Sequence, residues 1–158
     1  MITLTMDVEA VNQIANHPDV RPFLGGEGPA DLGPLMDTPG SLTFWIPEGG
    51  VFILHAVSLQ VYNAHSLFLP WARRYSRQAM RDVLGMVFRA GAKEIWTMIP
   101  DGNRAAAALA KLGGFSQIGF CDRMFPVPGG PVAVTTWALT RDEWVAREER
   151  NRGRTCQQ

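Results

Sequence analysis

The chain has 158 residues, of which 46% are hydrophobic and 19% are charged, a composition that favours a folded protein and excludes a largely disordered one. Its 15 lysines and arginines balance its 15 aspartates and glutamates, so no net charge draws it to nucleic acid or to an anionic membrane. Two distant cysteines, Cys121 and Cys156, predict neither a disulfide framework nor a metal site.

The length predicts a single domain, which we place at residues 1–145, followed by a polar tail over residues 146–158. The N-terminus shows no basic segment followed by an apolar run, and no later stretch approaches the roughly 18 apolar residues of a membrane helix. We therefore expect a cytoplasmic protein without membrane or nucleic-acid partners.

The first half of the chain predicts a helix, a loop and three strands. Asp7 is a good N-cap, and apolar residues recur at helical spacing over residues 8–15 until His17-Pro18 ends the pattern. Residues 25–40 are rich in glycine and proline, which predicts a long surface loop, and loops of this length are often functional. Three β-rich runs follow and should form an antiparallel meander. These runs are residues 42–46, 51–59 and 61–69.

A change of hydrophobic period after Pro70 predicts a helix over residues 77–90, which Ser76 can cap. A strand over residues 93–99 follows this helix. Because a helix separates it from the strand that ends at Leu69, we expect the two strands to run parallel.

The C-terminal part predicts one more helix, a hairpin and a last helix. Thr140 and Glu143 have the spacing of a capping box at the start of that last helix. Together the elements predict an α/β (α+β) fold, with a mixed central sheet of about six strands and flanking helices. The elements are a helix over residues 103–112, strands over 115–126 and 132–139, and a helix that ends after Arg150.

Two segments, in this order and at this separation, resemble the GNAT N-acetyltransferase family. Residues 67–78 are similar to the family's strand, proline, arginine and glycine-rich turn into a helix. Residues 103–115 are similar to its pattern of asparagine, alanine, leucine and a terminal Gly-Phe. The run His17-Pro18-Asp19-Val20-Arg21-Pro22 further resembles short GNAT-like proteins of tailed bacteriophages and prophages.

The resemblance implies that acetyl-coenzyme A binds as the acyl donor, with its pyrophosphate at the start of the helix after Pro70. A helix N-terminus offers unpaired N–H groups, and arginines add charge-assisted hydrogen bonds. The alternative is a solvated basic helix start. Ser76 and Gln78 stand where the family mostly has glycine, which lets the backbone approach phosphate closely. The implied cofactor-binding residues are Phe68, Leu69, Arg73, Arg74, Tyr75, Ser76, Arg77, Gln78 and Asn103.

His65 is the candidate catalytic base, because a histidine with a pKa of about 6.5 can accept a proton from an amine. The alternative is a hydrogen-bonded structural histidine. The resemblance implies that Asn103 contacts the cofactor, as the matching asparagine commonly does in such proteins. An asparagine here also suits a helix N-cap. Ala110 stands where many GNAT enzymes have a tyrosine that protonates the departing thiolate.

The resemblance implies an N-acetyltransferase whose partners are coenzyme A and an amine acceptor that the sequence does not identify. We expect the loop over residues 25–40 to shape the site of this acceptor. The alternative is a catalytically inactive GNAT-like binding or assembly protein, encoded by a phage and present in the host cytoplasm. The missing glycines and tyrosine favour this second interpretation, whereas the arginines and Asn103 oppose it. A homodimer is compatible with either.

Overall fold

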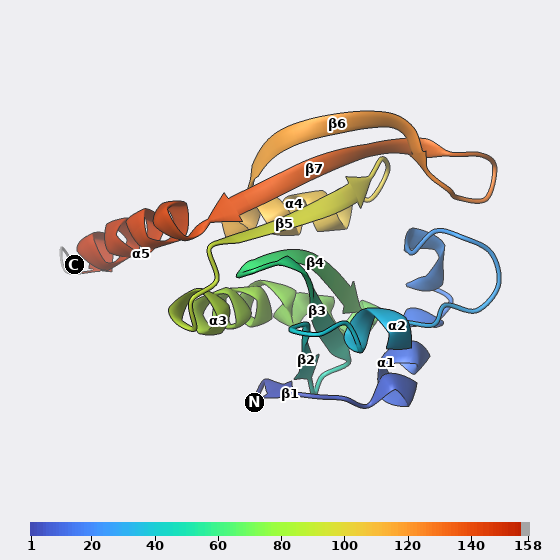
Figure 1. Ribbon diagram of the computed structural model, residues 1–158, viewed down its shortest axis with the longest axis horizontal. Coiled ribbons are helices and arrows are strands. Elements are labelled where there is room, and N and C mark those ends of the chain that lie inside the picture. Colours follow the sequence, from blue (N-terminus) through green and yellow to red (C-terminus); the bar gives the residue numbers. More distant parts are fainter. Residues whose placement is uncertain (156–158) are drawn as a thin grey trace.

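The computed structural model describes residues 1–155, which form one mixed sheet with helices on its two faces (Figure 1). Cys156 and the end of the tail expected over residues 146–158 lie outside the described residues. The strands are β1 (Thr3–Leu4), β2 (Leu42–Ile46), β3 (Gly50–Ser58), β4 (Val61–Phe68), β5 (Glu94–Pro100), β6 (Ser116–Phe125) and β7 (Val132–Thr140). The helices are α1 (Val8–Ala15), α2 (Gly33–Met36), α3 (Ser76–Arg89), α4 (Arg104–Gly113) and α5 (Arg141–Thr155), with 3-10 helices η1 (Arg21–Phe23) and η2 (Pro70–Tyr75).

The sheet has seven strands in the order β1-β2-β3-β4-β5-β7-β6. Strands β1 to β4 form an antiparallel meander, β4 and β5 run parallel, and β5, β7 and β6 are antiparallel. The α/β fold class and the predicted parallel pair are therefore confirmed. The additional strand β1 consists of two exposed residues, Thr3 and Leu4, which are too few to show an alternating pattern in the sequence.

The two faces of the sheet carry two apolar cores, because successive side chains of β3 and β4 point to opposite sides. Val51 and Leu67 pack with Val11 of α1 and with the residues around α2. Phe52 and Phe68 pack instead with α3 and α4. A side chain of β4 therefore faces either the α1 and α2 layer or the α3 and α4 layer, according to its position in the alternation.

The last helix begins at the predicted capping box. The Thr140 N–H donates to Glu143 Oε2 at 2.8 Å, and the Glu143 N–H donates to Thr140 Oγ1 at 3.3 Å. The expectation that this helix ends after Arg150 was wrong, since α5 continues to Thr155. The stacking of Trp144 on Phe88, with ring centroids 5.4 Å apart, holds the start of α5 against the core. Within residues 1–155, no helix is long and apolar enough to cross a membrane.

Candidate active site

Strands β4 and β5 begin side by side and then separate. Their parallel ladder joins only residues 61–63 to residues 94–96. Over the described residues, no pairing between them continues to their ends at Phe68 and Pro100, whereas β7 pairs with the whole of β5 on its other edge. Figure 1 shows the two strands diverging from the short ladder. The sheet is therefore open near its middle.

The backbone of β4 turns N–H groups toward this opening. On the opposite side, Leu69 donates its N–H to the Gly49 carbonyl oxygen at 3.0 Å, next to β3. Because the N–H direction alternates along a strand, Ser66 and Phe68 direct their N–H groups to the side of β5. Of the two backbone positions predicted to contact the cofactor, Phe68 therefore offers an N–H to the opening, and Leu69 has its N–H already bonded.

A cavity of about 530 Å³ occupies the opening. Cavities of roughly 300–1,000 Å³ with mostly apolar linings are typical of small-molecule sites. The lining comes from β4, β5 and the segment of residues 21–35 on the α1 face, and from α3 and α4 on the other face. The loop expected over residues 25–40 contains α2 and borders the cavity, so it lies where we expected a loop that shapes an acceptor site.

Two buried polar atoms in this lining lack partners. Asn63 Oδ1 and His65 Nε2 are inaccessible to solvent and accept or donate no hydrogen bond within the described part of the chain. Both side chains alternate in phase with Leu67, so they point to the face covered by α1 and α2. An unsatisfied buried polar group costs about 1–3 kcal/mol, which favours a role for these atoms in ligand binding. Sequence reasoning identified His65 but missed Asn63, although a polar residue two positions earlier on the same strand face was a usable signal.

Burial lowers the pKa of His65 from its ordinary 6.5 to about 4, and the nearby His55 lowers it further in the same direction. The imidazole is therefore neutral at neutral pH. As pH falls from about 6.5 to about 4, His65 binds a proton in the unfolded chain but not in the folded chain, so the free energy of unfolding decreases over this window.

We expect the free energy of unfolding to fall by roughly 3 kcal/mol more in the wild type than in His65→Gln between pH 7 and pH 4, since each pKa unit corresponds to about 1.4 kcal/mol. Urea denaturation at a series of pH values measures this difference. Parallel curves for the two proteins would show that His65 is protonated as easily in the folded state as in the unfolded one.

Residues 21–35 line the part of the cavity on the α1 face of the sheet, which we call its α1 end. Arg21 donates from Nε to Gly28 O and from Nη1 to Gly25 O, both at 2.7 Å. Gly26 donates its N–H to Pro126 O at 3.2 Å, which ties the segment to the β6–β7 hairpin. A Cβ atom on Gly25, whose φ is +71°, would lie 2.8 Å from the Phe125 ring. Glycine is therefore required where this segment meets the hairpin.

The predicted pyrophosphate segment differs from the expected helix start. The expectation that Ser76 caps α3 was wrong, because η2 leads directly into the helix and Tyr75 occupies the cap position without a side-chain hydrogen bond. The Ser76 N–H donates to Arg73 O, and the Ala72 N–H donates to Leu69 O. Fewer backbone N–H groups are thus free for an anion, and any phosphate here depends more strongly on the arginine side chains.

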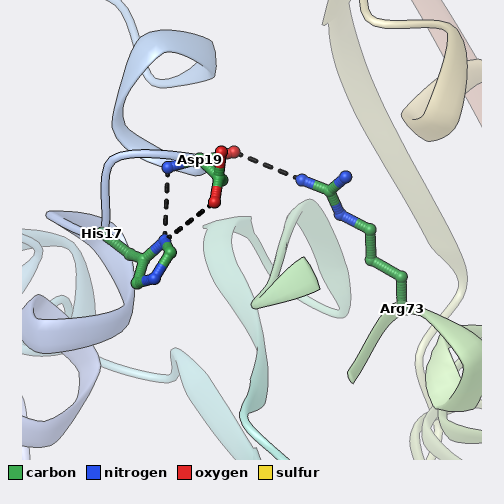
Figure 2. Close-up of polar contacts among 3 residues, drawn as sticks. All are labelled: His17, Asp19 and Arg73. Carbon is green, nitrogen blue, oxygen red and sulfur yellow. Dashed lines mark hydrogen bonds and ion pairs between the residues drawn. The ribbon is translucent and has the colours of Figure 1, made fainter. Parts of the chain in front are cut away.

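Arg73 links η2 to the segment that follows α1 (Figure 2). Its Nη2 donates to the carbonyl oxygen of Asp19 at 3.3 Å. The Asp19 N–H donates in turn to His17 Nδ1 at 3.2 Å, and the His17 ring meets Trp71 edge to face, with centroids 5.7 Å apart. The side chain of Arg73 is exposed, so its remaining N–H groups are accessible to a ligand.

The other predicted phosphate residues lie on the surface of η2 and α3, outside the cavity lining. The Arg74 guanidinium lies 4.8 Å from the centre of the Tyr75 ring. Gln78 donates from Nε2 to Asp82 Oδ1 at 2.9 Å, one helical turn further on. Arg77 borders a separate small cleft between α3 and α5. This group is cationic and exposed, and the structure does not bring it together with His65.

Asn103 lines the cavity and also caps α4, since its Oδ1 accepts the N–H of Ala106 at 3.1 Å. The helix-cap interpretation is confirmed, and the cofactor interpretation stays a prediction. Ala110 is buried and borders the same cavity. The position at which many GNAT enzymes have a tyrosine therefore faces the cavity, and the alanine found here supplies no proton donor.

No protein-family model matches the sequence, and no curated protein sequence matches it. The spermidine N-acetyltransferase of Vibrio cholerae, in complex with CoA and spermine, is similar in structure, with a TM-score of 0.77 and 13% identity over 91% of this chain and 98% of that chain. The ribosomal-protein-S5-alanine acetyltransferase of Vibrio fischeri is similar with a TM-score of 0.74 and 12% identity over 90% of this chain and 93% of that chain. The chain has the GNAT fold.

At these identities the similarity to GNAT structures concerns the fold. It covers 91% of this chain and 98% of the Vibrio cholerae chain. What this chain does within the GNAT fold follows from its own side chains.

Proposed function

We propose that this protein is an acetyl-coenzyme A-dependent N-acetyltransferase. The observation that supports this most strongly is the cavity between β4 and β5, which contains the unpartnered buried atoms Asn63 Oδ1 and His65 Nε2. Along this opening, β4 presents backbone N–H groups that can bind an extended arm. The similar Vibrio cholerae enzyme was crystallised with CoA and spermine, which is compatible with a thioester donor and an amine acceptor.

Bound acetyl-coenzyme A would supply a thioester, whose carbonyl carbon the amine attacks and whose carbon–sulfur bond then breaks. The N–H groups of Ser66 and Phe68 face the opening, where they can hold the arm and stabilise negative charge on the carbonyl oxygen. Arg73 and Arg74 hold the pyrophosphate at the exposed surface. These residues would position the donor near the opening, with His65 on the α1 face of β4.

His65 accepts the proton that the nitrogen loses. With a pKa of about 4, its imidazole is too weak a base to deprotonate a free alkylammonium. The amine therefore enters neutral, and His65 Nε2 takes the proton as the new carbon–nitrogen bond makes the nitrogen acidic. Ala110 cannot protonate the departing thiolate, so water supplies that proton.

A second candidate is a GNAT-fold protein that binds its ligand without turnover, of the kind that phages encode. The observation in its favour is the replacement of a glycine-rich turn by η2, which uses the N–H groups of Ala72 and Ser76 internally. This candidate predicts ligand binding at the cavity and no acetylated product.

Calorimetric titration of the full chain with acetyl-coenzyme A tests the proposal first. We expect saturable binding with a Kd in the micromolar-to-millimolar range, about −8 to −4 kcal/mol. Incubation with a panel of amines, followed by mass spectrometry, then separates the two candidates. Binding with an acetylated amine supports the enzyme, and binding without any product supports the second candidate. If neither acetyl-coenzyme A nor coenzyme A gave a heat of binding, both candidate functions would be contradicted.

A further inference from the structure

The α1 end of the cavity combines buried hydrogen-bonding atoms with an apolar surround. Asn63 Oδ1 and His65 Nε2 lie on the same face of β4, two residues apart. Apolar side chains from three elements complete this end of the cavity: they are Phe23, Leu24, Leu32, Leu35 and Phe125. A ligand held here needs a small group with N–H donors and an apolar body attached to it.

The charged side chains that line the cavity are Arg21, Glu27 and Asp31. Arg21 is bonded to two carbonyl oxygens of its own segment. Asp31 Oδ1 accepts from Asn12 Nδ2 at 2.9 Å and from the Gly33 N–H at 3.0 Å, and both bonds lower the pKa of this exposed carboxyl. Glu27 is exposed to solvent. Within the described lining, no charged side chain lies on β4 or β5, beside Asn63 and His65.

The two carboxylates of the lining, Glu27 and Asp31, lie on the segment before α2 and not on β4, so a second ammonium group beside Asn63 and His65 would lack a carboxylate partner there. Burying an ammonium group in that way is costly, because the charge loses its hydration. A single amino group avoids this cost, since it can enter neutral and donate to the two unpartnered atoms. The apolar side chains then bind a hydrocarbon or aromatic body.

We propose that the acceptor is a small primary amine with one amino group on an aryl or alkyl body, and that Asn63 is the positioning residue that holds this nitrogen beside His65. The inference rests on the proposed acetyltransferase function and specifies the substrate class for the same site.

The test uses 2-phenylethylamine, ethylamine and spermidine as probes, with wild type, Asn63→Leu, Asn63→Asp and Phe125→Ala. With acetyl-coenzyme A present, kcat/KM for 2-phenylethylamine should exceed that for spermidine at least about tenfold. Asn63→Leu should raise the KM and lower the kcat for 2-phenylethylamine, by at least about tenfold in kcat/KM. Asn63→Asp, which keeps an acceptor oxygen, should retain more of this activity than Asn63→Leu. Phe125→Ala should reduce the preference for 2-phenylethylamine over ethylamine.

Calorimetry with acetyl-coenzyme A on the same proteins separates donor binding, on which the acetyltransferase function depends, from use of the amine, which the inference concerns. Unchanged donor affinity in Asn63→Leu, together with the loss of amine use, supports the positioning role. Donor binding with preferred acetylation of spermidine, or full activity of a folded Asn63→Leu variant, would overturn the inference and leave the acetyltransferase intact. Loss of donor binding already in the wild type would overturn the acetyltransferase itself, and the inference with it.

Discussion

Replacing His65 by alanine should reduce acetyl-transfer turnover about 10²- to 10⁴-fold near neutral pH, with nearly unchanged affinity for acetyl-coenzyme A. The imidazole Nε2 is buried, has no partner within residues 1–155 and lines the cavity, so its removal takes away the group that receives the proton. Steady-state kinetics with an identified acceptor measures turnover, and calorimetry measures donor affinity. The loss should shrink as pH rises, because hydroxide then replaces the missing base.

The pH profile of the wild type provides a second readout. Because burial holds the pKa of His65 at about 4, kcat/KM should show no inflection near pH 6.5 that depends on His65. His55→Gln is a useful comparison, since it removes a histidine that does not line the cavity but that helps to lower the pKa of His65; it should keep the base in place and raise the pKa of His65. A folded His65→Ala variant with an unchanged rate from about pH 6 to 9 would show that His65 is structural.

Replacing both Arg73 and Arg74 by alanine should weaken acetyl-coenzyme A binding more than tenfold. Each charge-assisted hydrogen bond to phosphate contributes about 1.5–3 kcal/mol, and about 1.4 kcal/mol corresponds to a factor of ten. Since η2 already uses backbone N–H groups near this surface, the arginine side chains carry most of the expected interaction. Calorimetric titration of the double variant measures the effect.

Arg141→Ala combined with Arg150→Ala is the control for this second experiment, because it removes the same charge from exposed positions on α5. The control should bind the donor as the wild type does. Because Arg73 also contacts Asp19 O, a comparison of the unfolding free energies shows whether the double variant remains folded. Equal donor affinity in all three proteins would remove the pyrophosphate assignment from η2.

Local sequence patterns predicted the order of the main helices and strands of this protein but missed β1 and the short helix α2 within the loop expected over residues 25–40. Alternation marks β2 to β4, the change of period after Pro70 marks α3, and the Thr140–Glu143 capping box marks α5. These features depend on contacts between residues near in sequence, so a single sequence contains them. The two-residue strand β1 left no such pattern, and α5 continues through Asn151 and Gly153, although these residue types favour the end of a helix.

The candidate site depends on contacts between residues far apart in sequence. His65 was recognisable as a histidine on a strand, but its burial, its lowered pKa and its lack of a partner arise from β3, α1 and α2 packing around β4. The opening lies beyond the short ladder between β4 and β5, while β7 stays paired with all of β5 on its other edge. Likewise, η2 leads into α3 in place of the expected cap at Ser76, and its Arg73 contacts the carbonyl oxygen of the distant Asp19. Only the folded chain brings such distant groups together, so only the tertiary structure reveals Asn63 and His65 as a pair at one cavity.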